Sequence, residues 1–305
     1  MIPCFNSASL LAETLESVLA EDEGPQSMQI EVVDDASFLD DSERAVEQIG
    51  AGRIGYFRQP RNVGPSANFT TCIRRSAGHW VHVLHSDDLV LPGFYSRFRE
   101  AIEACPDASM VTAQTIAVDA AGERRLGVTP ALATADGYVK DAAFKIATTN
   151  PLRCVSVVVA RAAYERVGGF HPGLFHANDW EMWARVAGEG PVAWVDEPLG
   201  LYRVHHASDT MRLHRSTRYL LDCLAAVEMI SARFDPREQE RVRASGRGVV
   251  SKYGLSVGSE LLAEGWFRLA VANAALSVRI DPSAGNLARA IGIMGKSVAG
   301  RLGLG

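Results

Sequence analysis

The chain has 305 residues, of which 47% are hydrophobic and 22% are charged, a composition typical of a globular protein. This length allows one large domain or one domain with a sizeable appendage. The 31 Lys and Arg residues and the 36 Asp and Glu residues give a net charge of −5. Because no basic excess is available to neutralise phosphates, the composition excludes a general nucleic-acid-binding protein, and we expect no nucleic acid partner.

The cysteines and the hydropathy pattern indicate the compartment. The five cysteines, at positions 4, 72, 105, 154 and 223, include no closely spaced pair, so the sequence suggests neither a zinc site nor a disulfide framework. The sequence also shows no signal peptide and no run of about 18 apolar residues that would span a bilayer. We therefore expect a protein of the reducing cytoplasm.

Strands and helices alternate along the first part of the chain. Met1 enters a motif almost at once, so the first strand would be very short, and Asn6 or Ser7 can cap a helix predicted over 7–19. Strands and helices are then predicted in turn at 30–33, 43–49, 54–57, 66–77 and 80–84. Four such β/α alternations predict a doubly wound, mostly parallel sheet flanked by helices.

The middle of the chain mixes both kinds of element. The predicted elements are a helix over 92–105, a strand over 110–118, a buried strand over 154–159, helices beginning at 162 and 178, and short strands at 192–195 and 201–204. Asp119-Ala-Ala-Gly122 is predicted to form a hairpin turn after the long strand. We therefore expect an α/β domain over residues 1–212.

The remaining residues, 213–305, are predicted to form an all-helical extension. Helices are predicted at 218–234, 238–253 and 256–278, because apolar residues recur there at three- and four-residue spacing. The last stretch, 287–304, is rich in glycine and is expected to be a frayed tail. Its basic residues leave peripheral membrane contact open, and the extension could also pack on the first domain or mediate a homodimer.

Acidic pairs stand at the ends of two predicted strands. Asp34-Asp35 follows the strand at 30–33, and Asp87-Asp88 follows the strand at 80–84. In an open α/β sheet the carboxyl ends of the strands form the ligand-binding edge. One pair would suit Mg²⁺ or Mn²⁺ holding a diphosphate, and the other could hydrogen-bond a base or a ribose. The alternative for each pair is a turn that leads into a helix cap.

Seven short motifs extend this pattern over about two thirds of the chain. They are Pro3-Cys-Phe-Asn6, Val32-Val-Asp-Asp-Ala-Ser37, Asn62-Val-Gly-Pro-Ser-Ala-Asn-Phe69, His85-Ser-Asp-Asp88, Gly168-Gly-Phe170, Asn178-Asp-Trp-Glu181 and Tyr202-Arg-Val-His205. In order and spacing they resemble the family 2 glycosyltransferases of the GT-A fold. The resemblance implies a GT-A-like doubly wound mixed sheet and a metal-dependent, inverting enzyme. Such an enzyme moves a sugar from a UDP-, GDP- or dTDP-linked donor to a saccharide or glycoconjugate acceptor in polysaccharide or glycoconjugate synthesis.

The resemblance also implies roles for individual residues. The nucleotide pocket would be lined by Pro3, Phe5, Asp34, Asp35, Asn68 and Asp87. Asp88 would bind the Mg²⁺ or Mn²⁺ ion directly, with Asp87 beside it, and His205 could reach the metal or the diphosphate. His85 stands where many members carry a further acid, so the number of protein ligands is left open.

Asp179 matches the catalytic base of the family. An acceptor hydroxyl must lose its proton as it attacks C1 of the donor sugar from the face opposite the leaving diphosphate, through an oxocarbenium-like transition state. The start of a helix at 178 would stabilise the Asp179 carboxylate as the anion. The alternative is a helix cap before Trp180.

Several nearby residues have two interpretations. Arg203 could pair with a phosphate or with an acid of the site, and His206 is expected at the surface. Three tryptophans could form a sugar-stacking wall, although such residues more often belong to a core: Trp180, Trp183 and Trp194.

Three other functions compete with the glycosyltransferase interpretation. A sugar-phosphate nucleotidyltransferase would need a Gly-rich, Arg-containing loop where this chain has Pro3-Cys-Phe-Asn-Ser7. A signalling receiver module would be far shorter, with its first acidic pair after the first strand. A catalytically impaired glycosyltransferase-like binding domain is the remaining alternative, and the intact Asp87, Asp88 and Asp179 count against it.

Overall fold

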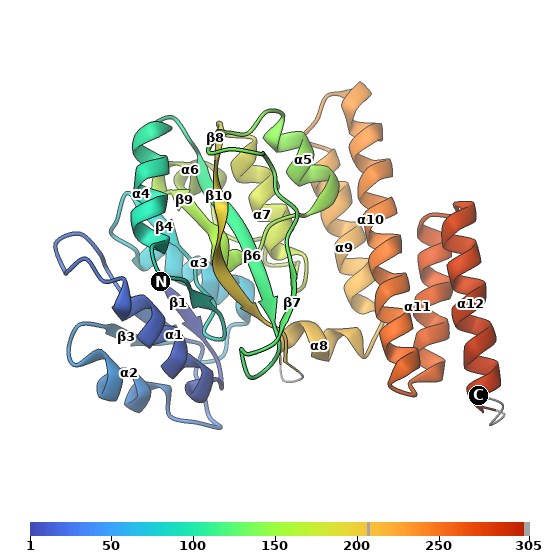
Figure 1. The fold of residues 1–305 in the computed structure, drawn as a ribbon, viewed down its shortest axis with the longest axis horizontal. Helices are drawn as coiled ribbons and strands as arrows, with labels where there is room; N and C mark the ends of the chain where they lie inside the picture. Colours follow the sequence, from blue (N-terminus) through green and yellow to red (C-terminus); the bar gives the residue numbers. More distant parts are fainter. Residues whose placement is uncertain (206–207, 302–305) are drawn as a thin grey trace. The chain divides into compact units, whose positions relative to one another are not determined.

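The computed structural model describes residues 1–205 and 208–301 (Figure 1). The chain forms two compact units. The first contains residues 1–146, 151–173 and 178–205, and the second contains residues 147–150, 174–177 and the described chain from 208 onward. His206, which was expected at the surface, lies outside the described residues.

The first unit begins with a three-stranded parallel sheet of order β1-β2-β3. Its strands are β1 (Ile2–Cys4), β2 (Glu31–Asp34) and β3 (Gly55–Arg58), and its helices are α1 (Ala8–Ala20), α2 (Ser42–Gly50) and α3 (Pro65–Arg75). The predicted elements of this region are confirmed to within two residues at each end. This agreement follows from the strong alternation of short apolar strands with amphipathic helices.

The strand that precedes Asp87-Asp88 belongs to a second, larger sheet. It is β4 (Trp80–His82), and it pairs antiparallel with β9 (Val157–Ala160) rather than extending the parallel series. The chain beyond β4 nevertheless runs beside β1. The Met1 amine donates to the His82 carbonyl at 2.9 Å, and the Leu84 N–H donates to the Met1 carbonyl at 3.0 Å. These bonds bring the second acidic pair to the same edge as the end of β2.

The larger sheet has the order β4-β9-β6-β10-β5 and is mixed. Its other strands are β5 (Leu89–Val90), β6 (Met110–Val118), β7 (Arg125–Val128), β8 (Gly137–Tyr138) and β10 (Val192–Arg203). The β6 and β10 strands are parallel, whereas β7 pairs antiparallel with β6 after the hairpin predicted at 119–122. The structure therefore confirms a mixed α/β sheet with flanking helices.

Two strand predictions in this sheet are wrong in detail. The segments 192–195 and 201–204 belong to one strand, β10, whose register shifts on either side of Pro198 because the strand stays paired with β6 across a bulge. The segment 154–159 begins as a 3₁₀ turn, Cys154–Ser156, before β9.

Helices cover both faces of the strands β6 and β10. The remaining helices of this part of the chain are α4 (Phe94–Ala104), α5 (Ala142–Thr149), α6 (Arg161–Val167) and α7 (Asn178–Ala187). Figure 1 shows α4 and α7 on opposite sides of β6 and β10. The three tryptophans are buried, and the Trp180 indole donates to the Ile146 carbonyl at 2.8 Å, so they form core rather than a sugar-stacking wall.

The second unit is helical in the described residues beyond 208. Its helices are α8 (Asp209–His214), α9 (Arg218–Ser231), α10 (Pro236–Ala263), α11 (Phe267–Ile280) and α12 (Ala284–Arg301). The break expected near residue 254 is wrong, because α10 runs through Gly254. A Cβ on Gly254 would lie 2.3 Å from Ser277 Oγ, so the glycine lets α10 approach α11 closely.

The expectation of a frayed tail is also wrong over the described residues. The helix α12 extends to Arg301, and its buried side chains include Ala290 and Ile293. The Ser297 hydroxyl donates to the Phe267 carbonyl at 3.2 Å, which ties α12 to the start of α11. No helix among the described residues is both long and apolar enough to cross a membrane.

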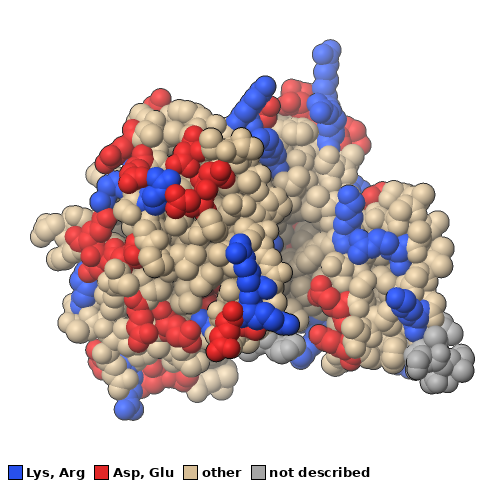
Figure 2. Space-filling view, viewed as in Figure 1, with Lys and Arg blue, Asp and Glu red and all other residues tan. Residues whose placement is uncertain are grey.

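Charged side chains of both signs are spread over the surface. Figure 2 shows acidic side chains prominently over the part of the first unit that holds α1 and α2. On α4, Arg97 is shared by three acids, Glu100, Asp136 and Glu197. The described residues form no extended basic patch on the face that Figure 2 shows.

Candidate active site

The first acidic pair lies at the end of β2. The fully buried Asp34 carboxylate accepts hydrogen bonds from the Tyr56 hydroxyl at 2.7 Å and from the Arg58 guanidinium at 2.9 Å. It also accepts from the backbone N–H and the hydroxyl of Ser37. Asp34 stands opposite Arg58 in the β2–β3 register, which brings these donors to it. The chain itself therefore occupies both oxygens of Asp34.

Asp35 supports the loop that leads into α3. Its carboxylate is 2% exposed, and it accepts one hydrogen bond from the Val63 N–H at 2.7 Å and one from the Gly64 N–H at 2.9 Å. Burial raises the pKa of Asp35, although the two backbone N–H groups act against that shift. Gly64 has a φ of +86°, a conformation that favours glycine. Asp35 thus fixes the shape of this loop.

The other residues expected in the nucleotide pocket differ in exposure. Asn68 is buried, and its amide donates to the Val33 carbonyl at 2.9 Å, so it ties α3 to β2. Pro3 is buried within β1. Phe5 is 38% exposed, and its ring centroid lies 6.0 Å from that of Phe38, which is 74% exposed. Of these residues, Phe5 offers a side chain that a ligand can contact directly.

The second acidic pair lies in the turn between β4 and β5. Asp88 is 1% exposed, and its Oδ1 accepts from the Arg203 N–H at 3.0 Å. Its Oδ2 is also buried and has no hydrogen-bond partner among the described residues. Asp87 is partly exposed, and its Oδ2 lies 3.0 Å from His205 Nε2.

The two carboxyl groups of this pair have opposite pKa shifts. Burial, and then the charge of Asp87, raise the pKa of Asp88 well above its usual value. Burial also acts to raise the pKa of Asp87, but the hydrogen bond from His205 and the charge of His85 outweigh it and lower that pKa. A buried carboxylate with one oxygen unpartnered among the described residues, beside a second carboxylate, is an arrangement that a divalent cation would satisfy.

Arg203 holds this turn in place. Its guanidinium is 3% exposed, and it donates to the Asp87 carbonyl at 3.1 Å, to the Ala120 carbonyl at 2.9 Å and to the Glu13 carboxylate at 2.7 Å. Its acid partner is thus Glu13 of α1 and not an acid of the predicted site, which it contacts only through backbone groups. Together with its backbone bond to Asp88, this makes Arg203 a positioning residue.

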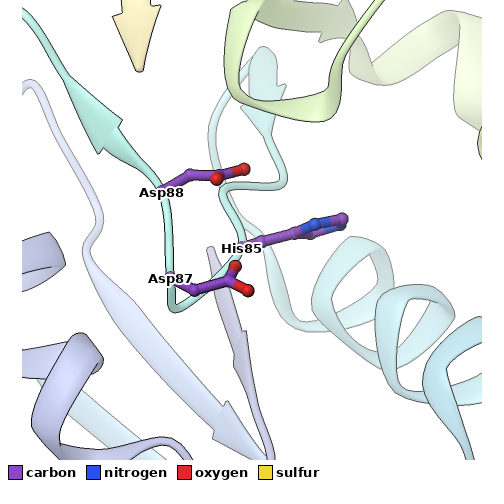
Figure 3. A group of neighbouring side chains, drawn as sticks. All are labelled: His85, Asp87 and Asp88. Atoms are coloured by element: carbon purple, nitrogen blue, oxygen red, sulfur yellow. The ribbon is translucent and has the colours of Figure 1, made fainter. Parts of the chain in front are cut away.

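His85 joins the acidic pair from the same turn. Figure 3 shows His85, Asp87 and Asp88 projecting from adjoining positions of one loop. One donor atom from each of the three lies within 4.8 Å of the others, as a shared cation would require. His205 contacts Asp87 but lies outside this group.

Asp179 lies at the start of α7, as expected. Its carboxylate is half-buried and accepts from the Trp180 N–H at 2.6 Å, while its own N–H donates to Asn178 Oδ1 at 2.9 Å. Burial raises the pKa of Asp179, and the charge of Arg153 and the Trp180 N–H only partly oppose it. The expected stabilisation of the anion is therefore outweighed, and the group becomes a stronger base.

Arg153 is a candidate that motif reasoning missed. Its positive charge acts on both Asp88 and Asp179, and it has no carboxylate partner among the described residues. Because β9 runs antiparallel to β4, the residues before β9 reach the edge where β4 ends. A half-buried guanidinium is suited to phosphate oxygens. Only the pairing of β9 with β4 points to Arg153, and the sequence does not reveal that pairing.

Comparison with known proteins identifies a family. Residues 1–152 match a family model described as glycosyl transferase family 2. Over 104 residues, the chain is 34% identical to the succinoglycan biosynthesis protein ExoO of Rhizobium meliloti, a match that covers 34% of this chain and 29% of ExoO.

Solved structures share the fold. TarS 1–349 of S. aureus, in complex with UDP-GlcNAc, has a TM-score of 0.69 at 16% identity and covers 99% of this chain and 90% of its own. The mannosyltransferase PcManGT of Pyrobaculum calidifontis, in complex with GDP-Man and Mn²⁺, has a TM-score of 0.58 at 15% identity. The match covers 99% of this chain and 85% of PcManGT.

Proposed function

The chain belongs to the family 2 glycosyltransferases, and from this premise we propose that it is a metal-dependent, inverting enzyme acting on a nucleotide-diphospho-sugar. The observation that carries the proposal is the buried Asp88, whose Oδ2 is unpartnered among the described residues, in the turn that also holds Asp87. A buried carboxylate oxygen without a partner is costly, and oxygen ligands suit Mg²⁺ or Mn²⁺. When bound, such a cation would neutralise the diphosphate as it leaves.

The nucleotide would lie against the edge formed by the ends of β1, β2 and β4. We propose that the pocket is lined by Pro3, Phe5, Asp34, Asp35, Asn68 and Asp87. Phe5 would contact the base, because its ring is exposed. The carboxylates of Asp34 and Asp35 would shape the pocket through the backbone they hold, and Asp87, steadied by His205, would lie near the ribose.

Asp179 would act as the catalytic base. Burial raises its pKa, which gives the carboxylate a stronger affinity for the proton of an acceptor hydroxyl. Deprotonated by Asp179, the acceptor oxygen would attack C1 on the face opposite the diphosphate, which inverts the anomeric centre. Arg153, whose charge acts on both Asp88 and Asp179, would bind diphosphate oxygens near the reacting carbon.

The relatives support the proposed donor and acceptor classes. TarS is solved with UDP-GlcNAc and PcManGT with GDP-Man and Mn²⁺, which supports a UDP-, GDP- or dTDP-linked donor. The resemblance to ExoO supports a saccharide or glycoconjugate acceptor in polysaccharide synthesis. We place the enzyme in the cytoplasm, with a catalytic domain over 1–212. The helical extension over 213–305 would provide a homodimer interface or a peripheral contact with the inner face of the membrane.

Calorimetric titration of UDP, GDP and dTDP, with and without Mn²⁺, tests the donor site. We expect at least one nucleotide to bind, and to bind more tightly with Mn²⁺. Absence of binding for all three nucleotides under every metal condition would refute the proposal as a whole.

The variant Asp179→Asn separates binding from transfer. We expect unchanged nucleotide affinity and a loss of transfer of about 10²–10⁴-fold, the usual contribution of a general base. The matched control is Glu165→Gln, an exposed change on α6, which should leave both quantities unchanged. Nucleotide binding by a wild-type protein that transfers no sugar would instead favour the catalytically impaired binding domain.

A further inference from the structure

His85 stands where many members of the resembled family carry a further acid. Among the residues that the structure describes, no other group of three His, Cys, Asp or Glu side chains brings its donor atoms so close together as His85, Asp87 and Asp88. All three come from one short turn, so their spacing depends on local backbone geometry (Figure 3). The turn is itself fixed, since the Asp88 N–H donates to the His85 carbonyl at 3.2 Å.

The imidazole of His85 packs on an aromatic ring, and one of its nitrogens has no hydrogen-bond partner among the described residues. Its ring stacks on Phe69, with centroids 4.9 Å apart and an angle of 24° between the planes. Its Nε2 is buried and unpartnered within the described chain, as is Oδ2 of Asp88, a residue that is 1% exposed. Buried polar atoms are nearly always hydrogen-bonded or bound to an ion. A cation bound by the cluster would give both atoms a partner.

His205 has a different place in the site. Its Nε2 lies 3.0 Å from Asp87 Oδ2, so that nitrogen is already engaged by a carboxylate. A histidine bound in this way orients a metal-binding carboxylate from outside the coordination shell. His205 is therefore suited to hold Asp87, and it leaves the ligand position to His85.

We propose that His85 is a nitrogen ligand of the divalent cation, which it binds together with Asp88 and Asp87 in a mixed nitrogen and oxygen site. The inference rests on the proposed function, because it concerns the cation of the same active site. Imidazole is a poor ligand for Mg²⁺, which prefers oxygen, and a better one for Mn²⁺ and Co²⁺. The site therefore selects a transition metal over Mg²⁺, which the usual acid at this position would not do.

Electron spin echo spectroscopy of Mn²⁺ bound to the full chain detects the ligand directly. We expect ¹⁴N modulation from a coordinated imidazole in the wild type and its loss in His85→Asp, which still offers a ligand atom. The control His205→Gln can still donate to Asp87, and it should retain the modulation. Modulation that survives in His85→Asp, that disappears in His205→Gln, or that is absent from Mn²⁺-loaded wild type would overturn the assignment.

Metal titration gives a second readout. Wild type should bind Mn²⁺ at least about tenfold more tightly than Mg²⁺, and His85→Asp should reduce that ratio by about tenfold or more. An unchanged ratio would contradict the proposal, and so would wild type that binds no Mn²⁺. Circular dichroism and thermal unfolding would establish that each variant is folded.

Failure here is distinguishable from failure of the proposed function. The calorimetric titration of UDP, GDP and dTDP is repeated on the same samples. Nucleotide binding and sugar transfer without ¹⁴N modulation would remove His85 from the metal and leave the glycosyltransferase assignment intact. Mn²⁺ binding with ¹⁴N modulation but no nucleotide affinity would keep His85 as a metal ligand and remove the glycosyltransferase assignment.

Discussion

The acidic pairs Asp34-Asp35 and Asp87-Asp88 both follow buried strands at one edge of the first unit, yet their carboxylates have different surroundings. Every oxygen of the first pair accepts at least one hydrogen bond from the chain, from donors that include Tyr56 and Arg58. In the second pair, Asp88 keeps one buried oxygen without a partner in the described chain. The first pair is therefore saturated by the protein, while the second leaves one oxygen without a partner among the described residues.

This difference shows that an acidic pair at a strand end has no fixed role. The carboxylates of the first pair stabilise the backbone around them, so their removal should mainly cost stability. The carboxylates of the second pair destabilise the fold, because they are buried and repel each other. Their removal should therefore mainly reduce sugar transfer. Four predictions follow this contrast.

The largest effect is expected for Asp88→Asn. A divalent cation contributes several kcal/mol of transition-state stabilisation, so transfer should fall by about 10³-fold or more. The free energy of unfolding without metal should stay the same or rise, because a buried charge is removed. Initial rates and urea unfolding measure the two quantities, with the exposed Asp107→Asn as control. Near-wild-type transfer, or a large loss of stability, would contradict the contrast.

The reverse pattern is expected for Asp34→Asn. The amide can accept from only some of the donors that surround Asp34, and it leaves the Arg58 charge without its partner. Because Arg58 is half-exposed, we expect a loss of about 2–3 kcal/mol, below the range for a fully buried pair. Urea unfolding measures it, and Mn²⁺ affinity should change by less than about twofold. A loss of Mn²⁺ binding equal to that of Asp88→Asn would show that the two pairs act as one site.

The sequence predicted the features of the site that depend on local order. Short strands, helices and the seven motifs lie close to where their spacing placed them, and Asp179 begins a helix. The sequence could not show which acids were saturated, because Tyr56 and Arg58, which donate to Asp34 Oδ2, come from β3, and the partner of Asp88 Oδ1 comes from the end of β10. Such contacts depend on strand order and register.

The errors have the same physical origin. The β10 strand reads as two strands, because Pro198 and its neighbours look like a break, yet pairing with β6 carries the strand past them. Gly254 reads as a helix end, but the close approach of Ser277 explains why a glycine stands inside α10. Tertiary packing decided the structure in both cases, and a single sequence shows packing only indirectly.

The pKa of the proposed base, Asp179, predicts how transfer depends on pH. Burial raises the pKa of Asp179, so transfer at low substrate should fall by about tenfold per pH unit below a midpoint above the ordinary aspartate value of about 3.9. Since the positive charge of Arg153 lowers this pKa, Arg153→Gln should move the midpoint to higher pH. The pH dependence of kcat/KM measures both midpoints. A midpoint that stays in place, or moves down, would exclude Arg153 from the surroundings of the base.

The smallest effect is expected for Tyr56→Phe, which removes one donor from a saturated carboxylate. Asp34 keeps Arg58 on the same oxygen and Ser37 on the other, so it is not left unpaired. The cost should therefore be that of one net hydrogen bond, about 1 kcal/mol, with unchanged transfer. Urea unfolding measures it against the exposed Tyr138→Phe. If Tyr56→Phe instead lowered nucleotide affinity as well, Asp34 would have to contact the ligand, and the first pair would belong to the site as directly as the second.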